Sequence, residues 1–412
     1  MQKRSGYALS AALLLGLLRP VGAQEWTRFR GPNGSGISQA TSVPVQWAET
    51  EVNWKLQLPG AGHSCPVVWK DRIFLTSADV TAQKRYVLCI GTNGKEIWRK
   101  TLDFPVHKKH NFNSFASATP AVDADAVYVM FNTLDSYDIM AFDHSGKELW
   151  KKDLGGYNAQ HSGGSSPIVL GESLIVAKEP DEGESSLVAL NRKTGAVKWQ
   201  KSRPGKNAVY ATPLVYQAKG GKPELIFQST LFGFTSLDPA TGELNWEQQV
   251  FKNRAVSSPI LAGELIVGAA GQGGGARELA AVRPGSRGAG VEPKVEYHLQ
   301  RGPSYVPTPL AYKDWIFCWG DGGIVTCLNA STGEQVWQER VGGDFFGSPI
   351  CVNGKLYAIS TRGEVVCIEA GPEFKVLGRS PLGEASHSTP SVADGVMYLR
   401  TEGHLFSVGG KK

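Results

Sequence analysis

The sequence lacks a strong excess of either charge, since 43 Lys and Arg stand against 38 Asp and Glu in 412 residues. That balance excludes the basic footprint of a nucleic-acid-binding protein. The 49 glycines follow no period of three, which excludes collagen. With 41% hydrophobic and 20% charged residues, the composition also argues against disorder and a coiled coil. We therefore expect a globular chain, long enough for one large or two ordinary domains.

Sequence motifs typical of enzyme active sites are also missing. The eight histidines include no His-x-His pair that would favour a metal enzyme. The glycine run at 271–275 lacks the Lys-Ser/Thr ending of a phosphate-binding loop, and Gly163-Gly164-Ser165-Ser166 belongs to a structural repeat instead of a nucleophile elbow. Without a complete catalytic set, a binding or scaffolding protein is favoured over an enzyme.

The N-terminus has the pattern of a secretory signal. Lys3 and Arg4 precede an apolar run at 8–18 that is too short to span a bilayer, and small residues follow at 21–23. Removing residues 1–23 leaves 40 basic residues (43 less three) against 38 acidic ones, a charge of +2. Because Gln24 follows the cleavage site, no Cys is available there for lipid attachment. We expect a periplasmic or secreted protein that is not a lipoprotein and has no transmembrane segment in its mature chain.

A proline preceded by a small residue, usually Ser or Thr, recurs eight times along the chain. The eight positions are Pro66, Pro120, Pro167, Pro213, Pro259, Pro309, Pro349 and Pro390. From the first to the last there are 324 residues in seven steps, or about 46 per step, which is the size of a propeller blade.

Each copy carries short apolar strands separated by turn residues, in the same order. In five copies a Trp stands four residues after a turn Gly: Trp98, Trp150, Trp199, Trp246 and Trp337. Tyr297 and Phe374 are the expected substitutes in the fifth and seventh copies. Four strands per copy make one antiparallel blade. The repeat therefore predicts an all-β, eight-bladed β-propeller of four-stranded antiparallel blades.

The eighth copy stops before its fourth strand, and residues 52–56 carry a Trp-bearing strand with no blade in front of it. We expect these two ends to pair and to close the ring, because closure hides sheet edges. The predicted organisation is a signal peptide at 1–23, an N-terminal strap at 24–51 and the propeller at 52–412.

Three copies end their third strand in a Thr-Gly turn that leads to the fourth strand, at 190–195, 237–242 and 328–333. Together with the eight Ser/Thr-Pro strands, these turns make residues 52–409 resemble the PQQ-like β-propeller repeat. The strap sequence at 26–34 and the ending at 399–405 resemble an exported bacterial subgroup named for the repeat alone. That resemblance implies a fold and not a reaction.

Two better-understood groups share this fold. Quinoprotein alcohol dehydrogenases hold pyrroloquinoline quinone (PQQ) and calcium over the axis, typically beside a vicinal disulfide, and this chain has no adjacent cysteines. Their calcium ligands and catalytic Asp find no matching positions here, so PQQ with calcium is not supported by a residue set. The outer-membrane assembly lipoprotein BamB is a scaffold, and its lipidated Cys is also missing.

Most of the six cysteines fall on repeat positions held elsewhere by small residues. Cys89, Cys327 and Cys367 occupy a third-strand position taken by Ala or Ser in the other copies, and Cys65 occupies the hydroxyl position before Pro. One bridge stays a candidate. If Gly322-Gly323 forms a two-residue hairpin turn, Cys318 and Cys327 face each other across two strands.

The residue three positions before each Pro should border the mouth of the central channel, since loops enter the inner strands there. The first and eighth blades are neighbours in a closed ring, so His63 and His387 are expected side by side. With neighbouring positions, the candidate ligand-binding residues at the mouth are His63, Asn113, His161, Tyr210, Arg254, Tyr305, Phe346 and His387.

Three interpretations of this set remain open: polar residues that cap turns and line the channel, a ligand site, and a metal site of His63, His161 and His387. We expect an exported, non-catalytic binding or scaffolding propeller, a monomer whose partner is a protein or small molecule of the cell envelope. The alternative is a PQQ-dependent dehydrogenase of alcohols or sugars that uses the same mouth.

Overall fold

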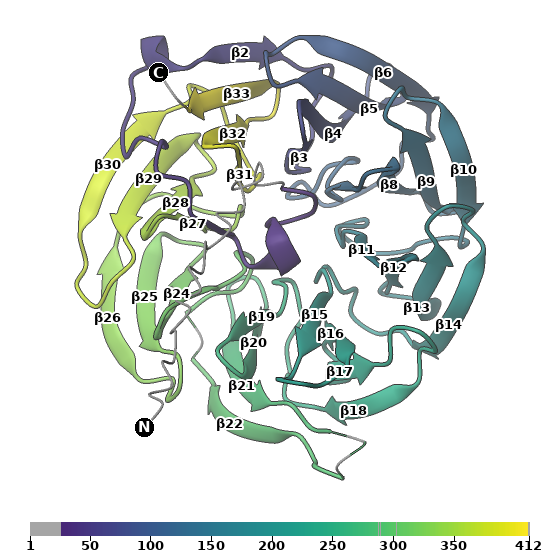
Figure 1. The fold of residues 1–412 in the computed structure, drawn as a ribbon, viewed down its shortest axis with the longest axis vertical. Coiled ribbons are helices and arrows are strands. Elements are labelled where there is room, and N and C mark those ends of the chain that lie inside the picture. The colour runs from purple at the N-terminus through teal and green to yellow at the C-terminus, as the bar shows by residue number, and fades with distance from the viewer. Residues whose placement is uncertain (1–25, 287, 289, 302, 411–412) are drawn as a thin grey trace, which may run out of the picture.

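Eight antiparallel sheets stand around a central axis in the computed structural model, as Figure 1 shows. The structure describes residues 26–286, 288, 290–301 and 303–410. The predicted all-β, eight-bladed propeller is confirmed. The predicted signal peptide lies outside the described residues and stays a prediction. Among the described residues, no helix has the length and apolarity needed to cross a membrane.

Seven blades take four consecutive strands each, from the axis outward. Blades one and two are Val67–Trp69 (β3), Arg72–Asp79 (β4), Lys84–Gly91 (β5), Glu96–Asp103 (β6), Ala121–Val122 (β7), Ala126–Asn132 (β8), Tyr137–Asp143 (β9) and Glu148–Asp153 (β10). Blades three and four are Ile168–Leu170 (β11), Ser173–Lys178 (β12), Glu184–Asn191 (β13), Val197–Pro204 (β14), Leu214–Gln217 (β15), Pro223–Ser229 (β16), Gly233–Leu237 (β17) and Leu244–Gln248 (β18).

The remaining blades follow the same order. Blades five and six are Ile260–Ala262 (β19), Leu265–Gly271 (β20), Arg277–Arg283 (β21), Lys294–Leu299 (β22), Leu310–Tyr312 (β23), Trp315–Trp319 (β24), Ile324–Asn329 (β25) and Gln335–Arg340 (β26). Blade seven is Ile350–Val352 (β27), Lys355–Ile359 (β28), Glu364–Glu369 (β29) and Val376–Pro381 (β30), and blade eight has Ser391–Ala393 (β31), Val396–Arg400 (β32) and His404–Gly409 (β33).

The ring closes as the sequence predicted. Trp54–Gln57 (β2) pairs antiparallel with β33, and Trp54 stands opposite Ser407. A second closure runs around the axis, where the backbone N–H of each pre-proline residue donates to the side chain of the same residue in the next blade at 2.9–3.3 Å. The ring runs through Cys65, Thr119, Ser166, Thr212, Ser258, Thr308, Ser348 and Thr389, and back to the Cys65 sulfur. The recurring hydroxyl is therefore an acceptor that joins neighbouring blades.

The recurring Trp joins the outer parts of the blades. In most copies its indole N–H donates to a carbonyl of the following blade, as from Trp98 to His144 at 2.9 Å. Trp246 instead donates to the Glu224 carboxylate of its own blade at 2.9 Å. The turn Gly has a positive φ, and a Cβ at Gly146 would lie 2.9 Å from the Trp98 ring. Tyr297 takes the Trp position in blade five, as predicted, and its hydroxyl donates to Ala330. The Gly-to-Trp spacing thus reflects contact between successive blades.

Blade seven corrects one expectation. Gly378 stands opposite Cys367, where the other blades place their aromatic residue, so Phe374 is not the substitute. Phe374 instead packs against Trp337 with ring centroids 5.3 Å apart. A Cβ at Gly378 would lie 2.4 Å from the carbonyl oxygen of Val45, because the strap occupies the place of the missing ring.

The candidate bridge between Cys318 and Cys327 is not formed. All six cysteines are free and buried. The hairpin turn takes four residues, 320–323, instead of two, which shifts the register by one residue and sets Cys318 opposite Thr326. Cys318 and Cys327 therefore point to opposite faces of their blade and belong to different core clusters.

The strap runs from the axis to the outer rim. Ile37–Ser38 (β1) pairs parallel with β27, the 3₁₀ turn Pro32–Gly34 (η1) lies near the centre of the ring in Figure 1, and Glu49–Glu51 (η2) leads to β2. Two strap cations are buried near the axis: Arg28 donates to the Pro213 carbonyl at 2.6 Å and Arg30 to the Thr308 carbonyl at 2.7 Å. These bonds tie the strap to the inner strands.

Candidate functional site

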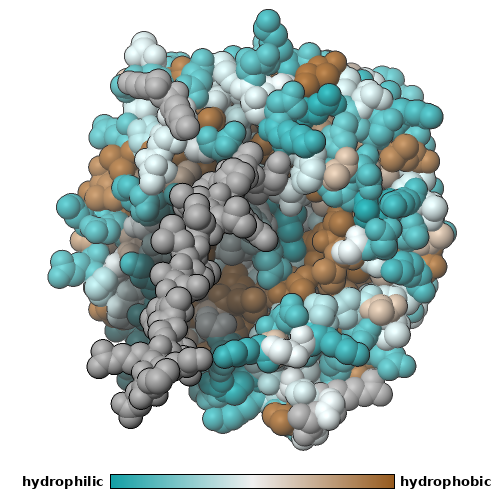
Figure 2. All heavy atoms as spheres, viewed as in Figure 1, coloured by the Kyte–Doolittle hydropathy of each residue, from teal (hydrophilic) through white to brown (hydrophobic). Residues whose placement is uncertain are grey.

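A cavity of about 1030 Å³ lies on the axis of the ring. The ring of pre-proline side chains forms part of its wall, and Phe29 of the strap also lines it. All eight residues expected at the mouth line this one cavity: His63, Asn113, His161, Tyr210, Arg254, Tyr305, Phe346 and His387. Figure 2 shows a hollow near the centre of the ring, with hydrophobic residues on its wall and hydrophilic ones over most of the surrounding face.

Aromatic rings follow one another around this cavity. Neighbours in the arc have ring centroids 4.3 to 6.0 Å apart, in the order His63, His387, Phe346, Phe112, His110, His161 and Tyr210. The connection between β6 and β7 supplies His110 and Phe112, and Phe112 is 60% exposed. Phe112 was not among the predicted residues, since it lies outside the repeat and its contact with Phe346 spans blades distant in sequence.

His63 and His387 meet as the closed ring predicted. Their rings are stacked, with centroids 4.5 Å apart and planes at 26°. Burial lowers the pKa of both imidazoles below their usual value. For His63 the neighbouring imidazole and then Arg400 add to that shift. Both rings are therefore neutral at neutral pH.

Arg400 lies behind this histidine pair and is fully buried. It donates to the Ser64 carbonyl at 3.0 Å and to the Thr76 carbonyl at 2.6 Å, and burial lowers its pKa to about 9. In the described part of the chain, carbonyl and hydroxyl oxygens hold this cation, and no carboxylate pairs with it. The carbonyls fix the guanidinium, which in turn fixes the loop that carries His63.

The opposite side of the mouth is more polar. Arg254 pairs with Asp181 at 3.1 Å, and Arg277 pairs with Asp321 at 3.2 Å. Burial lowers the pKa of His161 to about 4, with His110 and Arg254 adding to the shift. The Tyr210 hydroxyl is buried without a hydrogen-bond partner in the described part of the chain. The cavity thus combines an aromatic side with a charged side.

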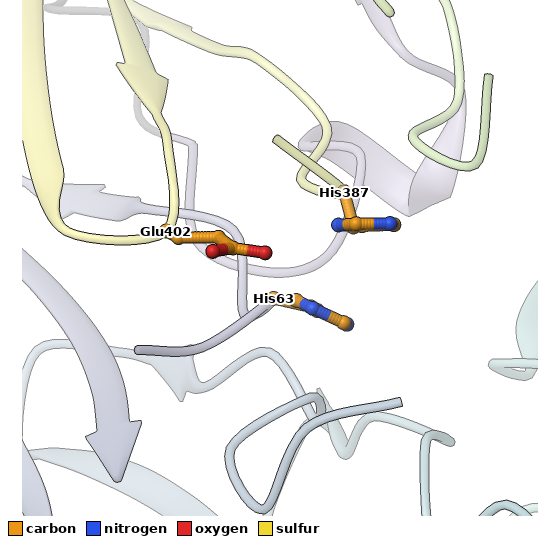
Figure 3. A group of neighbouring side chains, drawn as sticks. All are labelled: His63, His387 and Glu402. Carbon is orange, nitrogen blue, oxygen red and sulfur yellow. The ribbon is translucent and has the colours of Figure 1, made fainter. Parts of the chain in front are cut away.

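The third side chain beside the histidine pair is Glu402, which the sequence did not single out. One ligand atom from each of His63, His387 and Glu402 lies within 4.8 Å of the other two. Figure 3 shows the Glu402 carboxylate pointing toward the two imidazoles from the hairpin between β32 and β33. His161, which was grouped with the two histidines as a metal candidate, stands with His110 instead, 4.3 Å away.

The cavity lining does not fit calcium and PQQ. Calcium prefers about six to eight oxygen ligands. Asp321 and Asp344 are the carboxylates among the described lining residues, and Asp321 is engaged by Arg277 and by the backbone N–H of Val306. The oxygen shell that would hold the ion under a quinone is therefore not assembled.

Comparison with known proteins agrees with this architecture. A family model described as outer membrane protein assembly factor BamB matches residues 45–283 and 320–408. The BamB of Burkholderia pseudomallei is 30% identical over 102 residues, which are 24% of this chain and 26% of that protein. The BamB of Moranella endobia is 24% identical over 247 residues, 55% of this chain and 58% of that protein. The chain spans less than two thirds of the length of either relative.

Solved structures share the fold at low sequence identity. BamB from Moraxella catarrhalis matches with a TM-score of 0.63 and 15% identity, over 87% of this chain and 98% of that one. The quinohemoprotein alcohol dehydrogenase from Comamonas testosteroni matches with a TM-score of 0.71 and 13% identity, over 94% of this chain and 81% of that one. At these identities the likeness shows the fold alone.

Proposed function

The chain belongs to the outer membrane protein assembly factor BamB family, and on that premise we propose that it is a non-catalytic scaffold of the cell envelope. It acts in the assembly of outer-membrane proteins, the role that the names of its family and of its relatives state for those proteins. Its partner is a protein segment that docks at the mouth of the central channel. The predicted signal at 1–23 supports export to the periplasm.

The observation that carries this proposal is the arc of aromatic rings around the axial cavity. Aromatic side chains are enriched at protein interfaces because they bury a large apolar area at small entropic cost. Phe112 is the exposed member of the arc, and it contacts both His110 and Phe346. A partner segment that enters the cavity would cover Phe112 first.

The test compares two exposed apolar positions in cells that lack the native chain. Phe112→Asp changes the mouth, and Ile97→Asp, on outer strand β6, is the matched control because Ile97 is 47% exposed. We expect the native chain and Ile97→Asp to restore the folded fraction of outer-membrane proteins, and Phe112→Asp to restore much less. A photo-crosslinking residue at position 112 should capture a partner that the same residue at position 97 does not.

Two results would contradict this function. One is full restoration by Phe112→Asp with no crosslink at the mouth. The other is catalysis: if added PQQ with calcium quenches Trp fluorescence saturably and supports dye reduction by an alcohol or sugar, the chain is a dehydrogenase.

A further inference from the structure

Two imidazoles and a carboxylate converge at the seam between blades one and eight. His63 precedes β3, His387 precedes β31, and Glu402 stands in the hairpin after β32 (Figure 3). Their ligand atoms lie within 4.8 Å of one another. Ring closure brings these residues together, because more than 300 positions separate His63 from the other two.

The ring nitrogens and the carboxylate of these three side chains have no polar partner among the described residues. In the described part of the chain, no hydrogen bond or ion pair reaches the His63 ring, the His387 ring or the Glu402 carboxylate. The His387 Nδ1 atom is buried as well as unpartnered. Buried polar atoms are nearly always paired, so such a group calls for a water or an ion. The cluster therefore offers the lone pairs of two imidazoles and one carboxylate to such a ligand.

The chemistry of these donors selects the kind of ion. Neutral imidazole nitrogen suits zinc and other first-row transition metals, while calcium and magnesium take oxygen ligands. Two imidazoles and one carboxylate are a common zinc set that leaves a fourth position open. We propose that His63, His387 and Glu402 form a site for a divalent transition-metal ion of the zinc class, with its open position toward the axial cavity.

Hydrogen bonds to the neighbouring backbone hold the site in place. The backbone N–H of His63 donates to the Ala116 carbonyl at 3.1 Å and to Ser114 Oγ at 3.2 Å, and buried Arg400 supports the next residue, Ser64.

A second histidine pair in the same cavity provides a built-in control. His110 and His161 also have close rings, with centroids 4.3 Å apart, but no carboxylate or thiol among the described residues joins them in a comparable group of three. His161 lies instead beside the guanidinium of Arg254, whose charge contributes to its low pKa. A comparison of the two pairs therefore distinguishes metal binding at the proposed three-residue site from metal binding by any two neighbouring histidines.

The test uses the tag-free full-length mature chain and the metal ion alone. Calorimetric titration with Zn²⁺ should give one ion per chain, and Co²⁺ should give a visible absorption spectrum of low coordination number. His387→Gln and Glu402→Gln should each weaken Zn²⁺ binding by about tenfold or more, and His161→Gln should leave it unchanged. Calcium should not compete.

The proposal is overturned if His387→Gln and Glu402→Gln both bind Zn²⁺ as tightly as the native chain, or if His161→Gln loses as much affinity as they do. It is also overturned if no Zn²⁺ binds. Glu402 is partly exposed, so its variant should fold, and the thermal midpoint of each variant checks that it does. Because this experiment measures metal binding, its failure would leave the scaffold function standing, and the failure of that function would leave the metal site standing.

Discussion

The contacts that join neighbouring blades, here called the wall of the propeller, and the residues at the channel mouth come from the same eight copies. The two regions differ in which residues repeat. In the wall, the pre-proline acceptor and the turn Gly facing an aromatic ring recur from blade to blade. At the mouth, the corresponding positions carry different residues, from His63 and His387 to Tyr210 and Phe346. Repetition marks the contacts that hold the ring together, and variation marks the surface that can recognise something.

The largest effect should come from the outer wall contact. Trp199→Ala removes a buried ring that packs on Gly242 and donates to the Pro239 carbonyl at 3.0 Å. We expect a loss of about 3–5 kcal/mol in the free energy of unfolding, as for other large-to-small changes in cores. Denaturant unfolding measures it, with the exposed Val197→Ala on the same strand as the control. Equal losses for the two variants would refute this role.

A smaller effect is expected from the inner ring. Thr212→Val keeps the shape of the side chain but removes the oxygen that accepts from the Ser166 N–H at 3.2 Å. A buried N–H left without an acceptor costs about 1–3 kcal/mol. The midpoint of unfolding should fall accordingly, while Thr212→Ser should restore most of it. An unchanged midpoint for the Val variant would show that the ring does not stabilise the fold.

Lowering the pH should reduce the stability of the protein through His161 at the channel mouth. The pKa of His161 is lowered from about 6.5 in the unfolded chain to about 4, chiefly by burial, so the unfolded chain binds the extra proton between these values. Stability is therefore present above about pH 6.5 and is lost as the pH falls toward 4. Because this ring is only half buried, its share is on the order of 1 kcal/mol. Thermal midpoints across this range should fall less in His161→Gln. An equal fall would contradict the assignment.

The smallest effect is expected at Cys65, the one member of the pre-proline hydrogen-bond ring that has no hydroxyl. Cys65 accepts the Thr389 N–H through sulfur at 3.3 Å, and the other seven copies use a hydroxyl. Cys65→Ser should thus change the free energy of unfolding by no more than about 0.5 kcal/mol. A large loss would mean that this thiol has a role beyond filling the slot.

The sequence predicted the wall well because each wall contact is local to the repeat. Counting back from each Pro also found lining residues, since every copy enters the axis in the same way. Glu402 and Phe112 escaped that count because the hairpin and the connection that carry them differ in length and sequence from one copy to the next. The Cys318 register failed for a similar reason, since the length of one hairpin turn decides which residues face each other.

Blade seven shows a second reason why a prediction from the sequence of a single repeat copy can fail. Its fourth strand carries Gly378 where the others carry a ring, and the space is filled by strap residues more than 300 positions earlier in the chain. Nothing within the copy signals that replacement, so an aromatic residue nearby, Phe374, was the natural and wrong substitute. Contacts between distant segments decide such positions.

The most direct test of the division between wall and mouth measures stability and function in the same variant, Phe112→Asp. Because Phe112 is exposed and outside the wall contacts, its thermal midpoint should match that of the native chain. The folded fraction of outer-membrane proteins in cells that carry it should nevertheless fall to the level of cells without the chain. Full function with a native midpoint, or loss of both together, would contradict the account.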